Sequence, residues 1–525
     1  MFRLRLKPAL VALAAVLAVG SAGCAGSRSM LPGIGPEAAQ GIVMERAGSF
    51  TRLRNHSQPP VGMEMAWLMT DGSVLAQSYA GNTWYKYVPD DTGSYANGTW
   101  TQVATLPSGY DPDAFASDVL ADGRLVISGG EYNSPGNYDL QLVNLGAVYD
   151  PAKNTWTKLG HPNHWKWIGD SPSTVLPNGQ LMMGDKLHPW DAVLIPKSLK
   201  WKTVSDKGKS DWNAEEGWTL LADGTILTED VKNAPNSEIY DPATGKWKTA
   251  GSTIVDLHSP SPFKQCLTYG PKTKDCYLPP GEIGPAILRP DGTVFATGSG
   301  SGPSGYGTGH TAVYHSTGSQ AGTWTVGPDF PNGDNAGDSF AVLEPSGNVL
   351  VFGVSGELYE FNGTTFVSVG GAAGPPILLP TGQVMMLGYS SVVLYTPTGS
   401  PKSGWAPTIT SSPSTISSGQ TYQISGTQFN GLSQAMSFGD EYQNATNYPL
   451  VRIVNNASGH VFYAKTHDHS TMGVATGSEK VSTNFDVPSG IETGASKLYV
   501  VANGIASKAA NVTVSSGLRR RHRNR

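Results

Sequence analysis

Short apolar runs separated by polar turns recur seven times between Met63 and Gly388. Each repeat consists of an apolar run, a turn of the Asp/Asn-Gly kind and a second apolar run. Because glycine readily adopts the positive φ of a tight hairpin, each repeat predicts two paired strands. The turn glycines are Gly72, Gly123, Gly179, Gly224, Gly292, Gly347 and Gly382.

Most repeats continue with two further apolar runs around a Pro/Gly turn, most clearly from Ala147 (AVYDPAKNTWTKL) and from Ser237 (SEIYDPATGKWKTA). Four strands form one blade, and a single four-stranded sheet cannot bury both of its faces. Seven blades packed around an axis can bury them, so the pattern predicts an all-β fold with a seven-bladed kelch-type β-propeller over residues 45–404. We interpret the Tyr of YDP and the Trp of NTW as packing between blades.

The pattern changes near Thr408 to a Ser/Thr/Gly-rich run of alternating positions that lacks the blade signature. This change places a domain boundary between Ser403 and Pro407, and it predicts an immunoglobulin-like β-sandwich over residues 405–515. Residues 516–525 are basic and have no apolar periodicity, which predicts a disordered tail.

Residues 1–30 have the pattern of a targeting segment. Basic residues precede an apolar run from Ala9 to Val19 that is too short to span a bilayer. The sequence Ser21–Cys24 resembles a lipobox, in which Cys24 would be lipidated. We expect an exported protein, either secreted, periplasmic or held at the cell surface as a lipoprotein, whose only contact with a membrane is that lipid anchor.

Composition and charge limit the partners. The chain of 525 residues carries 64 Gly and 37 Pro, as expected for many short strands joined by turns. Its formal net charge of −5 offers no basic surface for phosphates, so nucleic acid is not expected as a partner. A carbohydrate or polysaccharide is the expected ligand, and the protein is expected to be a monomer.

Two cysteines remain once Cys24 is assigned to processing. Cys266 and Cys276 lie close together in a Gly/Pro-rich loop. In an oxidising compartment this arrangement predicts a disulfide, and the spacing lacks the additional ligands of a zinc site.

Two segments resemble the last domain of the galactose oxidase and glyoxal oxidase family. They are GDEYQNATNYPLVRI from Gly439 and FYAKTHDHSTMG from Phe462, and the resemblance covers about residues 45–515. It implies a seven-bladed kelch propeller whose last domain sends a hairpin along the axis to deliver a histidine to copper. By this resemblance His467 takes that position, with His469 beside it.

The same family uses a Tyr cross-linked to a Cys, and a Tyr-His pair in the last blade. The corresponding positions hold Phe115 and Ala116, Asp170, and the pair Ala372 and Ala373. A radical copper site is therefore not expected, and a copper oxidase is the least favoured function. His467 and His469 remain candidate ligands for another divalent cation.

Carboxylates stand eight to ten residues before the turn glycine in six of the seven repeats. They are Glu64, Asp113, Asp170, Glu216 with Glu215 next to it, Glu282 and Asp338. The innermost strands of a propeller begin around one mouth of its channel, so we expect these acids to form a ring there, joined by His467. Such close negative charges raise one another's pKa unless a cation lies among them.

The leading hypothesis for this ring is cleavage of a glycosidic bond. One protonated acid donates to the leaving oxygen while a second carboxylate attacks or activates water. The candidates for catalysis are Asp170, Glu216, Glu282 and Asp338. The candidates for substrate binding are Glu64, Asp113, Trp165, Trp167 and Trp212, whose rings could stack on pyranoses.

Other interpretations of the ring stay open. Carboxylate oxygens favour Ca²⁺, and the histidines would favour Zn²⁺ or Mn²⁺. The acids could also be hydrated groups that keep the mouth soluble. At the level of function, the alternative to an enzyme is a non-catalytic polysaccharide-binding or cell-surface adhesion protein.

Overall fold

The computed structural model describes residues 48–54, 62–78, 81–133, 140–261, 264–269, 273–300, 305–371, 374–388, 391–439 and 441–516. The targeting segment with Cys24, the Ala372–Ala373 position and residues 517–525 lie outside this part of the chain. The described residues include no helix that is long and apolar enough to cross a membrane.

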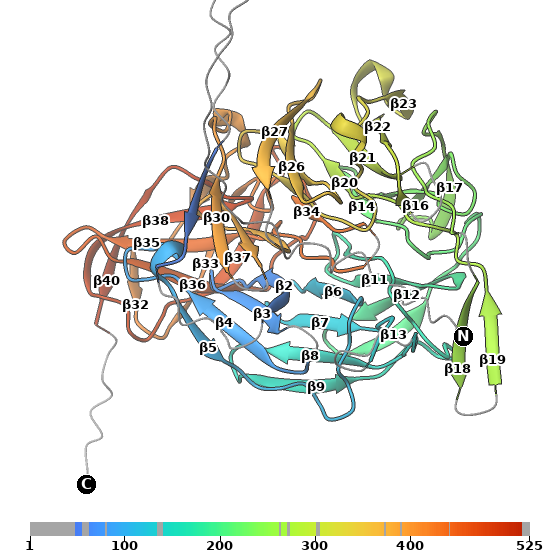
Figure 1. Ribbon diagram of the computed structural model, residues 1–525. Helices are drawn as coiled ribbons and strands as arrows, with labels where there is room; N and C mark the ends of the chain where they lie inside the picture. Colours follow the sequence, from blue (N-terminus) through green and yellow to red (C-terminus); the bar gives the residue numbers. More distant parts are fainter. Residues whose placement is uncertain are drawn as a thin grey trace, which may run out of the picture.

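Seven antiparallel blades surround a central axis and form a β-propeller, as predicted (Figure 1). Blade 1 contains β2 (Met63–Leu68), β3 (Val74–Ser78), β4 (Trp84–Val88) and β5 (Thr99–Gln102). Blade 2 contains β6 (Ala116–Val119), β7 (Leu125–Ser128), β8 (Gly146–Asp150) and β9 (Thr155–Leu159). Blade 3 contains β10 (Ser173–Val175), β11 (Leu181–Asp185), β12 (His188–Ile195) and β13 (Lys200–Thr203). Blade 4 contains β14 (Thr219–Leu220), β15 (Ile226–Glu229), β16 (Asn236–Asp241) and β17 (Lys246–Ser252).

The remaining blades have the same order. Blade 5 contains β20 (Ala286–Leu288), β21 (Thr293–Gly300), β22 (Gly309–His315) and β23 (Thr323–Val326). Blade 6 contains β24 (Ala341–Leu343), β25 (Val349–Phe352), β26 (Glu357–Phe361) and β27 (Phe366–Gly371). Blade 7 contains β28 (Pro376–Leu378), β29 (Val384–Leu387), β30 (Val392–Thr396) and, as its outermost strand, β1 (Ser49–Arg52). Because β1 comes from the other end of the propeller sequence, its pairing with β30 closes the ring.

The predicted hairpins are present in all seven blades. Each turn glycine joins the first two strands of its blade and has a φ between 74° and 90°. A side chain is strained in this left-handed region, so glycine is required for the turn geometry.

Tyr–Trp pairs connect neighbouring blades. In blade 4, the rings of Tyr240 and Trp247 lie 5.3 Å apart, and the indole N–H of Trp247 donates to Asp191 of blade 3 at 2.7 Å. In blade 5, Trp324 donates in the same way to Ser237 of blade 4 at 2.9 Å. These aromatic residues therefore pack between blades, as their repetition in the sequence predicts.

The C-terminal part forms one curled sheet of nine strands. Its strands are β31 (Thr408–Ser411), β32 (Thr415–Ser417), β33 (Thr421–Thr427), β35 (Leu450–Asn455), β36 (Val461–His467), β37 (Val481–Asp486), β38 (Gly494–Ala502), β39 (Ile505–Ala506) and β40 (Ala510–Ser515). β36 pairs with both β35 and β37, so the two halves of the predicted sandwich are continuous. They enclose a separate core that includes Ile424, Ile453, Phe485 and Val500.

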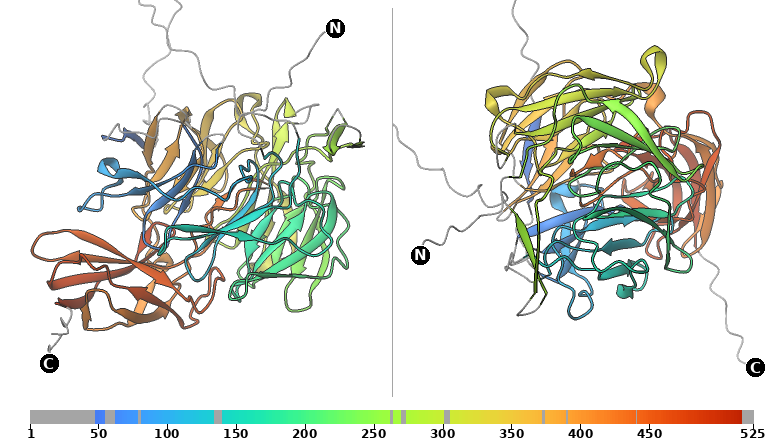
Figure 2. Two further views of the ribbon diagram at one scale, coloured as in Figure 1. Left: turned by 90° about the horizontal axis from the view of Figure 1, so that it is seen from below. Right: turned by 90° about the vertical axis from the view of Figure 1, so that its right-hand side faces the viewer.

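The curled sheet lies against one end of the propeller, in orange and red in Figure 2. It contacts the hairpin ends of the blades, since the Thr466 N–H donates to the Thr70 carbonyl and the Met472 N–H donates to the Pro177 carbonyl. Short 3-10 turns at Tyr95–Asn97, Gly318–Gln320, Pro331–Gly333 and Ser403–Trp405 complete the described helical structure.

One segment of the C-terminal part enters the propeller. β34 (Met436–Ser437) pairs with β24, the innermost strand of blade 6, so it stands inside the ring of blades. Gln434 donates to Thr174 of blade 3, and Asn444 donates to backbone carbonyls of blades 1 and 7. We call residues 433–447 the axial hairpin, because they run from the curled sheet to the opposite mouth of the propeller.

A further hairpin is inserted between blades 4 and 5. Its strands are β18 (Gln265–Tyr269) and β19 (Thr273–Tyr277). Cys266 and Cys276 face each other across it and form a disulfide, which confirms the predicted pairing.

Candidate functional site

A buried lysine lies among the acids at the mouth opposite the curled sheet. Lys186 follows β11, and its Nζ contacts Glu215 Oε1 at 2.8 Å, Glu131 Oε1 at 3.1 Å and the carboxylate of Asp170. Its side chain is 1% exposed. Three carboxylates from blades 2 to 4 therefore converge on one ammonium.

Two more predicted acids lie beside this group. The charges of Glu131, Glu215 and Lys186 all act on Glu282 and on Asp338. Both side chains are half-buried, as is Glu131, whereas Asp170, Lys186 and Glu215 are buried. We call Glu131, Asp170, Glu215, Glu282 and Asp338, together with Lys186, the axial acid cluster.

Burial and mutual repulsion set the protonation of this cluster. Burial raises the pKa of Glu282 well above its usual value, and the charges of Glu215 and Asp338 raise it further. The pKa of Asp338 is raised to about 7, chiefly by burial and then by the charges of Glu215 and Glu131. Burial likewise raises the pKa of Asp170, whose second oxygen, Oδ1, is sealed from solvent and accepts no hydrogen bond.

The pKa of Lys186 responds to two opposing effects. Burial lowers it, but the charges of Asp170, Glu131 and Glu215 more than offset burial and hold it well above its usual value. The lysine therefore stays charged and supplies one positive charge to five carboxyl groups.

The axial hairpin delivers a tyrosine to the same mouth. The Tyr442 hydroxyl donates to Asp113 Oδ1 at 2.6 Å and accepts from the Ala114 N–H at 2.7 Å. Burial raises the pKa of Asp113, while hydrogen bonds from Tyr442 and Glu64 lower it. Glu64 and Asp113 thus share a hydrogen bond beside the axial acid cluster.

The ring prediction was wrong at Glu216. Its carboxylate points away from the axis and contacts Lys209 Nζ at 2.7 and 2.8 Å, and its neighbour Glu215 takes the axial position. Glu215 has a φ of 60°, which turns the backbone between the two residues. The position in the repeat located Glu215 and Glu216 but could not show which of the two faces the axis.

Three residues at the mouth were missed from the sequence. Lys186 directly follows β11, and Glu131 comes three residues after the end of β7. The second strand of each blade ends beside the head of the first strand. The antiparallel pairing could have indicated both of them. Tyr442 arrives from a segment more than 300 positions away along the chain, at the tip of the axial hairpin.

The three tryptophans do not form an open sugar platform. Trp165 is 3% exposed and packs in blade 3 with Ile168 and Met183. Lys166 lies over the ring of Trp167 at 5.5 Å, and Lys232 covers the ring of Trp212 at 4.3 Å. The predicted stacking role of Trp165 is therefore wrong, because no face of its ring is accessible.

The two histidines lie at the other end of the propeller. His467 ends β36 and contacts Asp468 at 2.7 Å and Asp486 at 3.3 Å, within the curled sheet. The ring of His469 is buried against Thr483, and its backbone N–H donates to Ala121 in the hairpin turn of blade 2. The expected entry of His467 into the acid ring is thus wrong, because a different segment forms the axial hairpin.

His469 makes stability depend on pH. Burial and the nearby His467 lower its pKa to about 3, so it stays neutral in the fold while the unfolded chain takes up a proton near pH 6.5. We expect acid to destabilise the protein through this group by up to about 1.4 kcal/mol per pH unit below 6.5.

Urea unfolding of wild type and His469→Gln between pH 7 and 4 measures this effect. The difference in unfolding free energy between the two should shrink as pH falls, since the variant lacks the titrating group. A difference that stays constant with pH would contradict the assignment.

Comparisons with known proteins find only distant similarity. A scan of known protein families finds no match. Two curated relatives, both N-acetylneuraminate epimerases of Haemophilus influenzae, are 28% and 27% identical over 153 residues, which is 29% of this chain. The match spans 37% of the length of either relative.

Solved structures with a similar course of the chain are more distant in sequence. A fungal alcohol oxidase in complex with copper covers 90% of this chain with 14% identity and a TM-score of 0.47. The virginiamycin B lyase of Staphylococcus aureus covers 67% with 12% identity and a TM-score of 0.42. The arrangement of its sheets shows that the chain is an all-β propeller protein.

Proposed function

We propose that this protein is exported and binds a carbohydrate at the mouth of the propeller, where the axial acid cluster cleaves a glycosidic bond. The proposal is carried by Glu282 and Asp338, two half-buried carboxyls at the same mouth. The charge of Asp338 acts on Glu282, and the pKa of each is raised. The disulfide in β18–β19 supports an oxidising compartment.

The two carboxyls take complementary roles in this proposal. The raised pKa of Glu282 favours its protonated form, which can donate to the leaving oxygen of a glycoside. Asp338, with a pKa of about 7, supplies a carboxylate that attacks the sugar or activates water. Glu215 is held by Lys186, and its charge raises both pKa values, while Asp170 contacts the same ammonium.

Epimerisation of a free sugar is the second candidate. It is favoured by the two epimerase relatives, and it needs the same kind of proton donor and acceptor. A binding protein without catalysis is the remaining alternative. Cys266 and Cys276 are bonded to each other, so neither thiol is free for the tyrosine cross-link of a radical copper oxidase.

We expect Glu282→Gln and Asp338→Asn to lower turnover by about 10²–10⁴-fold, because each removes one proton-transfer group. The wild-type rate should fall below about pH 7, where Asp338 becomes protonated, and the Asp338→Asn variant should lack this acid limb. Release of reducing ends from a polysaccharide panel measures cleavage, and NMR of N-acetylneuraminate measures epimerisation.

Glu344→Gln is the matched control. Glu344 is another buried acid with a raised pKa, but the charge that acts on it is that of Glu360, which is not part of the axial acid cluster. Its substitution should leave turnover unchanged. Retention of polysaccharide in a pull-down without new reducing ends would reject cleavage in favour of a binding protein.

A further inference from the structure

A second buried acid cluster lies in blade 4. Lys209 Nζ contacts Glu216 at 2.7 Å and Glu238 at 3.0 Å, and all three side chains are at most 3% exposed. The charges of Asp211 and Asp230 also act on Glu216. Four buried carboxyl groups therefore lie close together, and the ammonium of Lys209 contacts two of them.

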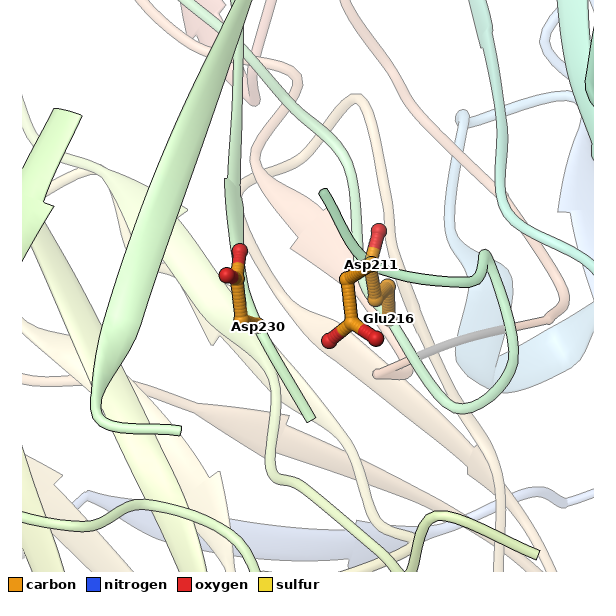
Figure 3. Close-up of side chains that lie close together, drawn as sticks. All are labelled: Asp211, Glu216 and Asp230. Carbon is orange, nitrogen blue, oxygen red and sulfur yellow. The ribbon is translucent and has the colours of Figure 1, made fainter. Parts of the chain in front are cut away.

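Three of these acids bring oxygen atoms together. One carboxylate oxygen each from Asp211, Glu216 and Asp230 lies within 4.8 Å of the others (Figure 3). Two oxygens bound to the same Ca²⁺ at 2.3–2.6 Å can be up to about 5 Å apart. The three oxygens are thus spaced as ligands of one calcium ion can be, whereas Mg²⁺ with its shorter bonds would draw them closer.

The unsatisfied oxygens of Asp230 are an independent reason to expect a cation here. It is 2% exposed, and both of its carboxylate oxygens are sealed from solvent without a hydrogen bond of ordinary geometry. Burial and the charges of Glu238 and Asp211 raise its pKa to about 8, although the charge of Lys209 and the Ser210 hydroxyl act to lower it. A buried carboxyl whose oxygens are so poorly satisfied costs free energy that a bound cation would offset.

Asp211 is already oriented by the backbone. Its Oδ1 accepts from the Trp212 N–H at 2.8 Å, and its Oδ2 accepts from the N–H groups of Lys232 and Asn233 at 2.8 and 3.2 Å. These bonds leave further lone pairs on both oxygens. Asp230 follows β15, so the cluster joins the loop before β14 to the end of β15.

We propose that Asp211, Glu216 and Asp230 form a Ca²⁺ site in blade 4. All three ligands are hard oxygen donors, and the excess negative charge around Lys209 favours a divalent ion. The site lies on the loop that also carries Glu215 into the axial acid cluster. Calcium would therefore stabilise the backbone that positions Glu215, whether or not the axial cluster is catalytic.

Calcium titration of chelator-treated protein tests the proposal. Isothermal titration with CaCl2 should show one site, and 1 mM Ca²⁺ should raise the Tm by on the order of 2 °C or more. The Asp230→Asn variant should lose both signals, because its amide removes one charged ligand. The control Asp118→Asn should keep both, since Asp118 is a buried acid of blade 2 outside this cluster.

A second readout does not depend on the folding of a variant. Tb³⁺ bound to wild-type protein should luminesce when tryptophan is excited, and Ca²⁺ should displace it. The site would be overturned if wild-type protein showed neither a binding heat nor a Tm shift at CaCl2 concentrations up to 10-fold above 1 mM. It would also be overturned if Asp230→Asn kept both signals. Displacement of Tb³⁺ by Mg²⁺ but not by Ca²⁺ would overturn the choice of ion.

Discussion

Lys186→Met is expected to lower the free energy of unfolding by about 3–5 kcal/mol, because it leaves buried carboxylates without their cation. Asp170 and Glu215 are 4% and 8% exposed in their side chains, so water cannot replace the ammonium. The aliphatic part of methionine fills a similar volume, which limits the change to the loss of charge. Chemical denaturation at pH 7 measures this loss.

The deficit of Lys186→Met should depend on pH in a defined direction. Burial already raises the pKa of Asp170 in the fold, and without the ammonium that pKa rises further, so Asp170 takes up a proton on folding. Stability from this group is then present below its unfolded pKa of about 4 and is lost as pH rises through the folded pKa. The deficit should therefore be smaller at pH 5 than at pH 8.

Lys86→Met is the matched control for charge removal. Lys86 pairs with Asp71 at 2.6 Å, but the two side chains are 29% and 24% exposed. Solvent screens such a pair, so its loss should cost about 1 kcal/mol or less. Equal deficits in the two lysine variants would show that burial of the axial ammonium has no special importance.

Gly217→Ala is expected to displace the tip of the axial hairpin. A Cβ added to Gly217 would lie 2.0 Å from the carbonyl oxygen of Gly439, and this backbone atom cannot rotate away. We expect a destabilisation of about 1–3 kcal/mol and a loss of any activity that needs Tyr442 beside Asp113. Thermal unfolding and amide hydrogen exchange across residues 433–447 measure the two effects.

Gly160→Ala separates this steric effect from a general effect of replacing glycine. A Cβ on Gly160 would meet nothing within 4 Å, and its backbone conformation has no positive φ. This variant should unfold like wild type and retain slow exchange in the axial hairpin. Faster exchange in both variants would argue against the predicted collision with Gly439.

Regular local patterns made the propeller predictable. A tight turn needs glycine at one position, and the seven such turns predicted the hairpins and the number of blades. The Tyr–Trp pairs were likewise visible because the same residues recur in several repeats, and in blades 4 and 5 their Trp contacts the neighbouring blade. The pairing of β1 with β30 has no such local signal, because it joins residues from the two ends of the propeller.

The acid ring could be predicted only in part. Position in the repeat located Asp170, Glu282 and Asp338 near one mouth, because the first strand of every blade begins there. It could not choose between Glu215 and Glu216, since the φ of one residue decides which carboxylate faces the axis. The assignment of His467 failed because the resemblance of its segment to a known family could not show which strand enters the channel. That strand is β34, whereas His467 stays in the curled sheet.

The sequence by itself determined the strands, the turns and the end of the blades at which the carboxylates gather, because these follow from residue periods within one repeat. Only the tertiary structure decided that Lys186 holds three of the acids and that Tyr442 reaches Asp113. Such contacts join distant residues through the closure of the ring, and the burial that results, rather than residue identity, sets their charges.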